Sequence, residues 1–194
     1  LTLEYLEAEF YTIGVNSGVI PGADRQTFIT IRNHEIAHVQ FLLDVLGGAA
    51  VAKPAFDFTA GGMFAPFSDY AQFQLLAQAF EDTGVRAYKG QLGALQPYKT
   101  FLSAGASIHS VEARHASQVR RMRGLDGWIP FNGSDSPAAV AAVYAGEGAT
   151  TQAGVDLTGL NLGAFNVSPE DITESFDEPL DMQAVLAIAA PFIA

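Results

Sequence analysis

Apolar residues recur at helical spacing through the first two thirds of the chain, with polar residues between them. This pattern predicts four helices, over residues 1–14, 24–46, 69–95 and 100–123. Gly47 and Gly124 end the second and fourth of them, and Pro97 ends the third. Because short turns join the first helix to the second and the third to the fourth, each pair should form an antiparallel hairpin.

Two segments without helical periodicity complete the expected fold. Residues 49–68 are rich in Gly, Pro, Ala and Phe, and about 20 such residues suit a crossover along a helical bundle. Residues 124–194 contain no Lys or Arg and ten acidic residues. We therefore expect an all-α fold: a four-helix bundle over 1–124, made of two antiparallel hairpins joined by a long crossover, and an acidic, loop-rich extension over 125–194. This extension should pack on the bundle and end in a fifth helix over residues 179–193.

Composition excludes several classes of function. The chain has 194 residues, 21 acidic against 10 basic side chains, a formal charge of -11 and no cysteine. Without cysteine there is no disulfide, thiolate metal site or thiol nucleophile, so a metal would need carboxylates and imidazoles. The acid excess argues against a nucleic-acid partner, and no apolar run reaches the roughly 18–20 residues of a membrane span.

The first residues bear on localisation. The chain opens on Leu1 rather than Met, and the apolar spacing of a helix is already present there. We expect an upstream segment, and a removed signal peptide would make the protein periplasmic or secreted.

Two Glu-x-x-His pairs carry the strongest chemical signal. They are Glu35 with His38 in the second helix and Glu112 with His115 in the fourth. Ten glutamates and four histidines in 194 residues would give only about 0.2 such pairs by chance. Since residues at i and i+3 project from one helix face, each pair can bind a single metal ion.

The pairs belong to an internal repeat of a helical hairpin. A shift of 77 residues superimposes Glu4 on Glu81, Tyr11 on Tyr88, Glu35 on Glu112, His38 on His115 and Gly47 on Gly124. At ~1.5 Å per residue, Glu4 and Glu35 lie about 15 and 16 Å from their connecting turn, which puts them at one level. Four glutamates and two histidines should therefore meet at the middle of the bundle.

Such a cluster needs positive charge. Four buried carboxylates must bind cations, become protonated or be exposed, and two divalent ions would balance them. Oxygen and imidazole ligands without sulfur suit Fe or Mn. The alternative is a coincidental set of surface carboxylates and core histidines.

A resemblance to a known family follows from these residues. One Glu on each of two helices, Glu-x-x-His on each of the other two, and a long crossover resemble the ferritin-like di-iron and di-manganese carboxylate superfamily. Within it, four runs resemble the ferritin-like domain family of desiccation-related proteins: Leu3–Tyr11, Asn33–His38, Phe176–Leu180 and Ala187–Phe192. The resemblance implies two Fe or Mn ions per chain and a stress-associated, often exported protein. The implied ligands are Glu4, Glu35, His38, Glu81, Glu112 and His115, with Glu35 and Glu112 as bridging carboxylates.

Three further residues are candidates at this site. Tyr11 and Tyr88 would donate hydrogen bonds to ligands or be oxidised, or else simply pack in the core. Glu7 follows Glu4 by one turn, and its counterpart in the repeat is Gly84. The missing side chain would leave room for Glu7 to turn inward or for a small substrate; the alternative is that Glu7 is a surface residue.

The expected function is redox chemistry on oxygen or peroxide in stress protection, either catalase-like or as an oxidase or ferroxidase, with the bridging carboxylates Glu35 and Glu112 taking part. One alternative is a non-enzymatic structural or assembly protein whose metal pair only stabilises the bundle. Another is an iron store, which requires a closed shell. The sequence leaves open whether the chain forms a homo-oligomer or a larger assembly.

Overall fold

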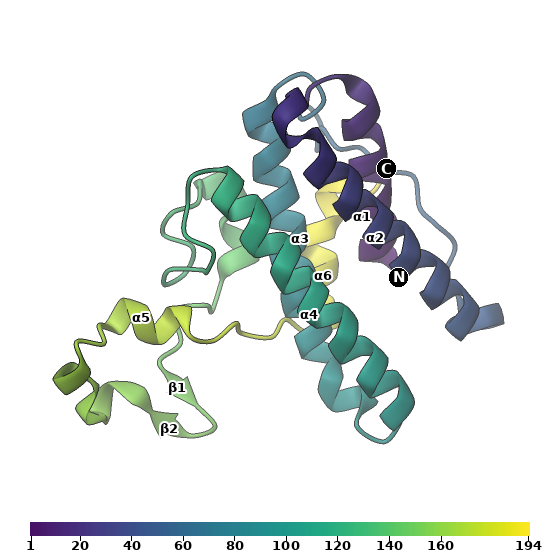
Figure 1. The fold of residues 1–194 in the computed structure, drawn as a ribbon. Coiled ribbons are helices and arrows are strands. Elements are labelled where there is room, and N and C mark those ends of the chain that lie inside the picture. The colour runs from purple at the N-terminus through teal and green to yellow at the C-terminus, as the bar shows by residue number, and fades with distance from the viewer. The chain divides into compact units, whose positions relative to one another are not determined.

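A computed structural model describes all 194 residues and is mostly helical (Figure 1). The four long helices are α1 (Thr2–Ser17), α2 (Gly22–Leu46), α3 (Tyr70–Leu95) and α4 (Lys99–Met122). After α4 come the strands β1 (Thr151–Gln152) and β2 (Val155–Asp156), which pair as an antiparallel hairpin, and the short helices α5 (Pro169–Glu174) and α6 (Met182–Ala189). The 3-10 helices are η1 (Gly47–Ala49), η2 (Ala138–Tyr144), η3 (Leu157–Gly159), η4 (Asn161–Phe165) and η5 (Ala190–Phe192).

The four predicted helices are present, with shifted ends. The first continues past residue 14 to Ser17, where Gly18 adopts a left-handed φ of 82° that ends it. The final helix, expected over 179–193, is shorter: the Leu180 N–H before it donates to the Arg86 carbonyl, and residues Ala190–Phe192 after it form a 3-10 turn that contains a proline. α5 was not predicted, although its Ser168-Pro169 start carries a capping box with Asp171.

The chain forms two compact units. Unit 1 comprises residues 1–84 and 183–194, and unit 2 comprises residues 85–182. α3 contributes its first part to unit 1 and its last part to unit 2. The predicted division of the chain at residue 124 stays a prediction.

Aromatic side chains form the core of unit 1. α1 packs against α2, and Phe10 of α1 stacks on Phe73 of α3 with ring centroids 4.8 Å apart and an interplanar angle of 9°. Phe28 of α2 meets the same ring edge-on at 4.9 Å. A Cβ on Gly14 would lie 2.2 Å from Phe73 Cε2, so only glycine lets α1 approach this ring so closely.

The segment between α2 and α3 is held by the C-terminal residues of unit 1. The Asp57 N–H donates to the Phe192 carbonyl at 2.9 Å, and the Ala194 N–H donates to the Ala55 carbonyl at 2.9 Å. Phe192 also packs edge-on against Phe80 of α3, with centroids 5.0 Å apart. The segment is therefore anchored to this unit, with Phe58 and Phe64 buried and most of its other residues exposed.

In unit 2, a buried arginine fastens the loop region to α3. The Arg86 guanidinium donates to the carbonyl oxygens of Ala145 and Glu178 at 2.8 Å each, and also to that of Val143. Its Nε lies 2.6 Å from Glu147 Oε1, and both side chains are 1% exposed. The Glu178 N–H in turn donates to Glu147 Oε1. One ion pair thus binds η2, the following loop and the segment before α6.

This ion pair predicts a pH dependence of stability. Burial raises the pKa of Glu147 from its ordinary value of 4.5 to about 7, against the opposing charge of Arg86. Between these values the folded state binds more protons than the unfolded state, so Glu147 contributes stability that is lost as the pH rises towards 7. We expect Glu147→Gln to remove part of the fall in unfolding free energy between pH 5 and pH 8, measured by urea titration. Parallel profiles for the variant and the wild type would contradict this assignment.

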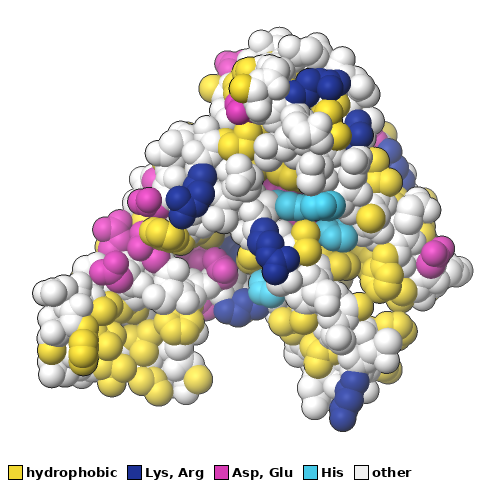
Figure 2. Space-filling view, viewed as in Figure 1, with side chains coloured by type: hydrophobic (Ala, Val, Ile, Leu, Met, Phe, Trp, Pro, Cys, Tyr) yellow, Lys and Arg dark blue, Asp and Glu magenta, His cyan; other side chains and the backbone are white.

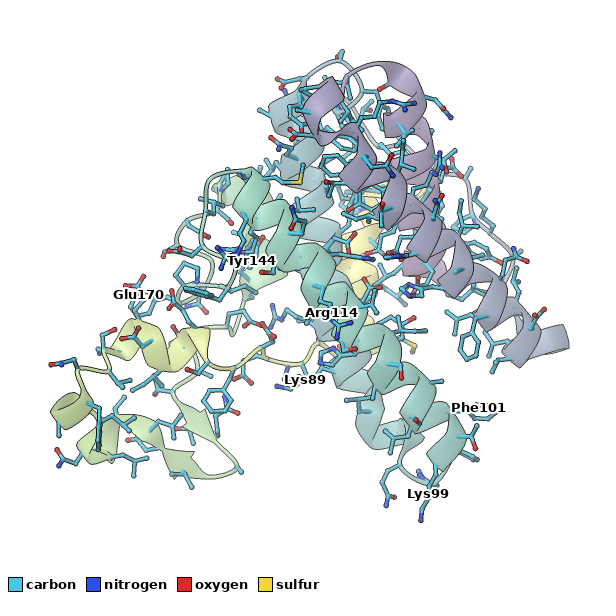
Figure 3. All side chains as sticks on the ribbon, in the orientation of Figure 1. Lys89, Lys99, Phe101, Arg114, Tyr144 and Glu170 are labelled. Atoms are coloured by element: carbon cyan, nitrogen blue, oxygen red, sulfur yellow. The ribbon has the colours of Figure 1, made fainter.

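Unit 2 exposes hydrophobic side chains on its surface. Hydrophobic side chains are exposed on the segment from β1 to η4, where they include Val155, Leu160 and Phe165 (Figure 2). Lys99 and Phe101 lie at the start of α4 (Figure 3). No helix of the structure has both the length and the apolar character needed to cross a membrane.

Candidate metal centre

Unit 1 gathers three predicted ligands from two helices. Glu4 lies on α1, and Glu35 and His38 lie one turn apart on α2. His38 Nδ1 is 3.2 Å from Glu4 Oε2 and 3.1 Å from Glu35 Oε2. Each of the three residues offers one ligand atom, and these atoms lie within 4.8 Å of one another. Both carboxylates are at most 1% exposed.

Helical spacing places Glu35 in the core. The buried residues of α2 are Phe28, Ile31, Glu35 and Val39, which follow one another at intervals of three or four. This spacing is that of a single apolar stripe, and Glu35 occupies one of its positions. A carboxylate at such a position is costly unless charge or hydrogen bonds compensate it.

Glu81 of α3 is the fourth predicted ligand in unit 1, and the Tyr11 side chain hydrogen-bonds to it. The Tyr11 hydroxyl donates to Glu81 Oε1 at 2.6 Å. Glu81 and Glu35 each offer an oxygen within 4.8 Å of the other. Burial, and then the charge of Glu81, raise the pKa of Tyr11 well above its ordinary value of 10. Tyr11 therefore remains a protonated donor to this carboxylate.

Unit 2 holds the other Glu-x-x-His pair. Glu112 and His115 lie one turn apart on α4, both are buried, and each offers one ligand atom within 4.8 Å of the other. Tyr88 of α3 is half-buried in this unit. The meeting of all six ligands in one site remains a prediction from the internal repeat.

A family model described as the ferritin-like domain matches residues 1–125. The chain belongs to the ferritin-like domain family. The predicted all-α, ferritin-like fold is thereby confirmed, with four long helices and a C-terminal loop region that ends in a short helix. No curated protein and no solved structure matches the chain. The desiccation-related subtype stays a prediction.

The buried residues of this ferritin-like domain fit a metal site. Their donors are carboxylate oxygens and imidazole nitrogens without sulfur, a set that suits Fe or Mn. Glu4, Glu35, Glu81 and Glu112 are all at most 1% exposed, and bound cations would offset the cost of burying their charges. The ferritin-like fold thus carries buried Glu and His clusters that could form a di-metal site.

Two charged residues that are paired in the structure, Arg86 and Glu147, carry no clear signal in the sequence. Arg86 and Glu147 lie 61 positions apart in the chain, and neither belongs to the internal repeat. Glu147 is one of ten acidic residues in a segment without Lys or Arg. Its only distinguishing signal is its place between Gly146 and Gly148, which is too weak to indicate burial.

Proposed function

We propose that the protein is a di-metal carboxylate protein that uses two Fe or Mn ions for redox chemistry on oxygen or peroxide. The reaction is catalase-like disproportionation or an oxidase or ferroxidase step. The observation that carries this proposal is the group of Glu4, Glu35 and His38, in which both carboxylates are buried and the imidazole is partly exposed, and whose ligand atoms lie within 4.8 Å of one another. A cation bound between these residues would offset the cost of burying the two carboxylates.

The six predicted ligands would have different roles at the metal pair. Glu4 and His38 would hold one ion, Glu81 and His115 would hold the other, and Glu35 and Glu112 would be the carboxylates that both ions share. The metal pair supplies a redox centre and a Lewis acid when bound.

The other residues of unit 1 support these ligands. Tyr11 orients Glu81 through the 2.6 Å hydrogen bond from its hydroxyl. Tyr11 stacks on Phe28, with ring centroids 6.1 Å apart, and both side chains are fully buried. This aromatic packing keeps water away from Glu81, which strengthens the attraction between the carboxylate and a cation.

Metal analysis of natively purified protein and two activity assays test the proposal. The wild type should contain close to two Fe or Mn ions per chain and should turn over peroxide or oxidise ferrous ion. We expect Glu35→Gln to lose metal and to reduce turnover by at least about 100-fold, because a neutral amide cannot bridge two cations. Glu9→Gln is the matched control, since Glu9 lies on α1 in a surface ion pair with Lys53.

The outcomes separate the candidate functions. Less than one ion per chain in the wild type would contradict the metal site itself. Two firmly bound ions with no turnover in either assay would favour the structural alternative, in which the metals only stabilise the helices. Equal turnover of Glu35→Gln and the wild type would exclude the role of Glu35.

The proposed role in stress protection, with export from the cytoplasm, has separate support. It rests on the runs that resemble desiccation-related proteins, such as Leu3–Tyr11 and Phe176–Leu180. Immunodetection of the protein in periplasmic and extracellular fractions of dried and undried cells would test both parts. Detection only in the cytoplasm, at equal levels in both cultures, would refute them.

A further inference from the structure

Residues 151–167, which run from β1 to just beyond η4, form an apolar segment on the surface of unit 2. None of its residues is buried, and the side chains of Val155, Leu160 and Phe165 are exposed. The segment lies outside residues 1–125, the part of the chain that the ferritin-like family model matches. Exposed apolar side chains that gather in one segment are typical of a surface that binds a partner.

Contacts within unit 2 hold this apolar segment in place. β1 pairs with β2, and η3 packs against α5. The Gln152 side chain donates a hydrogen bond to the Glu178 carboxylate, and the Leu157 N–H donates to the Thr150 carbonyl at 3.0 Å. Because the backbone is already ordered, docking on a partner costs less conformational entropy than it would for an unstructured chain.

A second exposed apolar surface of unit 2 lies at the start of α4. Tyr98 and Phe101 are both exposed there, and their ring centroids are 6.4 Å apart. Lys99 is exposed next to them, and Figure 3 shows Lys99 and Phe101 projecting from this end of the α3–α4 hairpin. The hairpin end, residues 98–101, therefore combines two aromatic rings with a positive charge.

Charge in unit 2 is divided between the regions that contain these two surfaces. Residues 85–123 carry seven basic side chains and one acidic side chain, whereas residues 124–182 carry ten acidic side chains and no basic one. The hairpin end belongs to the basic region. The apolar segment belongs to the acidic region, with Asp156 exposed inside it and Glu170 exposed just after it. Two apolar surfaces from regions of opposite charge complement each other.

We propose that the apolar segment, residues 151–167, docks on the hairpin end, residues 98–101, of a second copy of this chain. Since each copy carries both surfaces, a twofold pair makes the contact twice. The formal charge of -11 makes two copies repel each other except where an acidic region meets a basic one, which favours this contact over others. None of the predicted metal ligands lies on either surface, so the association is independent of the proposed redox function.

Sedimentation velocity of the full chain over a range of concentrations tests the apolar side of the contact. The wild type should pass from monomer to dimer as its concentration rises. Val155→Asp should weaken the dimer by at least about 10-fold, because a charge replaces an apolar side chain at the contact. Val51→Asp is the matched control: Val51 is 54% exposed, against 49% for Val155, and lies in unit 1 on neither surface. This control should associate as the wild type does.

Lys99→Glu tests the charge of the hairpin end. This substitution should weaken the dimer by at least about 10-fold, because a carboxylate then faces the acidic region of the other copy. Lys53→Glu is its control, since Lys53 is exposed in unit 1 and lies on neither surface. Glutamate is favourable at the start of a helix, so Lys99→Glu should fold. The circular dichroism spectra and the unfolding of the monomeric variants should match those of the wild type, which separates loss of docking from loss of folding.

Three results would overturn the inference. A wild type that stays monomeric at every concentration leaves the apolar segment to a partner of another kind. A wild type that associates, with Val155→Asp and Lys99→Glu associating equally well, shows that the copies meet elsewhere. A weakened dimer in only one of the two variants contradicts the pairing of these two surfaces. If Val155→Asp does not fold, Phe165→Asp takes its place, because this side chain of the segment is more exposed.

Discussion

Replacement of Arg86 with Met is expected to lower the free energy of unfolding by about 3–5 kcal/mol at pH 8, measured by urea titration with circular dichroism. The guanidinium is 1% exposed and faces Glu147, which is equally buried. Its loss leaves an uncompensated carboxylate in the core and deprives the carbonyl oxygens of Ala145 and Glu178 of their donor. The penalty should be smaller at pH 5, where Glu147 becomes protonated.

Arg114→Met is the matched control for this variant. Arg114 lies exposed on α4 (Figure 3), so its replacement should change stability by no more than about 0.5 kcal/mol. Equal losses for the two arginine variants, or a loss at Arg86 that is as large at pH 5 as at pH 8, would contradict the account of the buried pair.

Truncation of Phe10 to Ala should cost about 3–5 kcal/mol of stability, because its ring is fully buried and cavities in such cores collapse only partly. Its ring packs against those of Tyr11, Phe58, Phe67, Phe73 and Phe80. Denaturant unfolding followed by near-ultraviolet circular dichroism measures the loss directly in this aromatic cluster.

Phe165→Ala controls for the loss of an aromatic ring as such. This side chain is 77% exposed on η4, and its removal should change stability by no more than about 0.5 kcal/mol. A loss below about 1 kcal/mol for Phe10→Ala would show that the core rearranges to fill the space.

The helices were predictable because their signals are local. Apolar spacing and glycine stops define α2 and α4 within a few residues, and the predicted ligand pair Glu35 and His38 proved to lie on one face of α2. Burial of Glu7 was left open by the sequence, because an acidic residue one turn after Glu4 fits a core face and a surface face equally well. Deciding between them requires knowledge of what packs on α1.

The structural features that the sequence did not predict depend mostly on contacts between residues far apart in the chain. The segment just before the final helix is held by a hydrogen bond from the Leu180 N–H to Arg86, a residue 94 positions earlier. The β1–β2 hairpin spans only two residues per strand, too few for an alternating pattern to be recognised. The pairing of Arg86 with Glu147 likewise depends on the path of a loop that has no periodic signal.

Unit 1 is built from two separate parts of the chain, and this has a consequence for biosynthesis. Its core includes Phe192, which packs on Phe80, and the strand-like contact between Phe56 and Ile193. Residues 183–194 leave the ribosome after the whole of unit 2. A nascent chain can therefore complete unit 2 while unit 1 still lacks the C-terminal residues of its core. The group of Glu4, Glu35 and His38 thus lies in the unit that is completed after unit 2, and under the proposed metal-binding function firm loading is expected only after residues 183–194 have been synthesised.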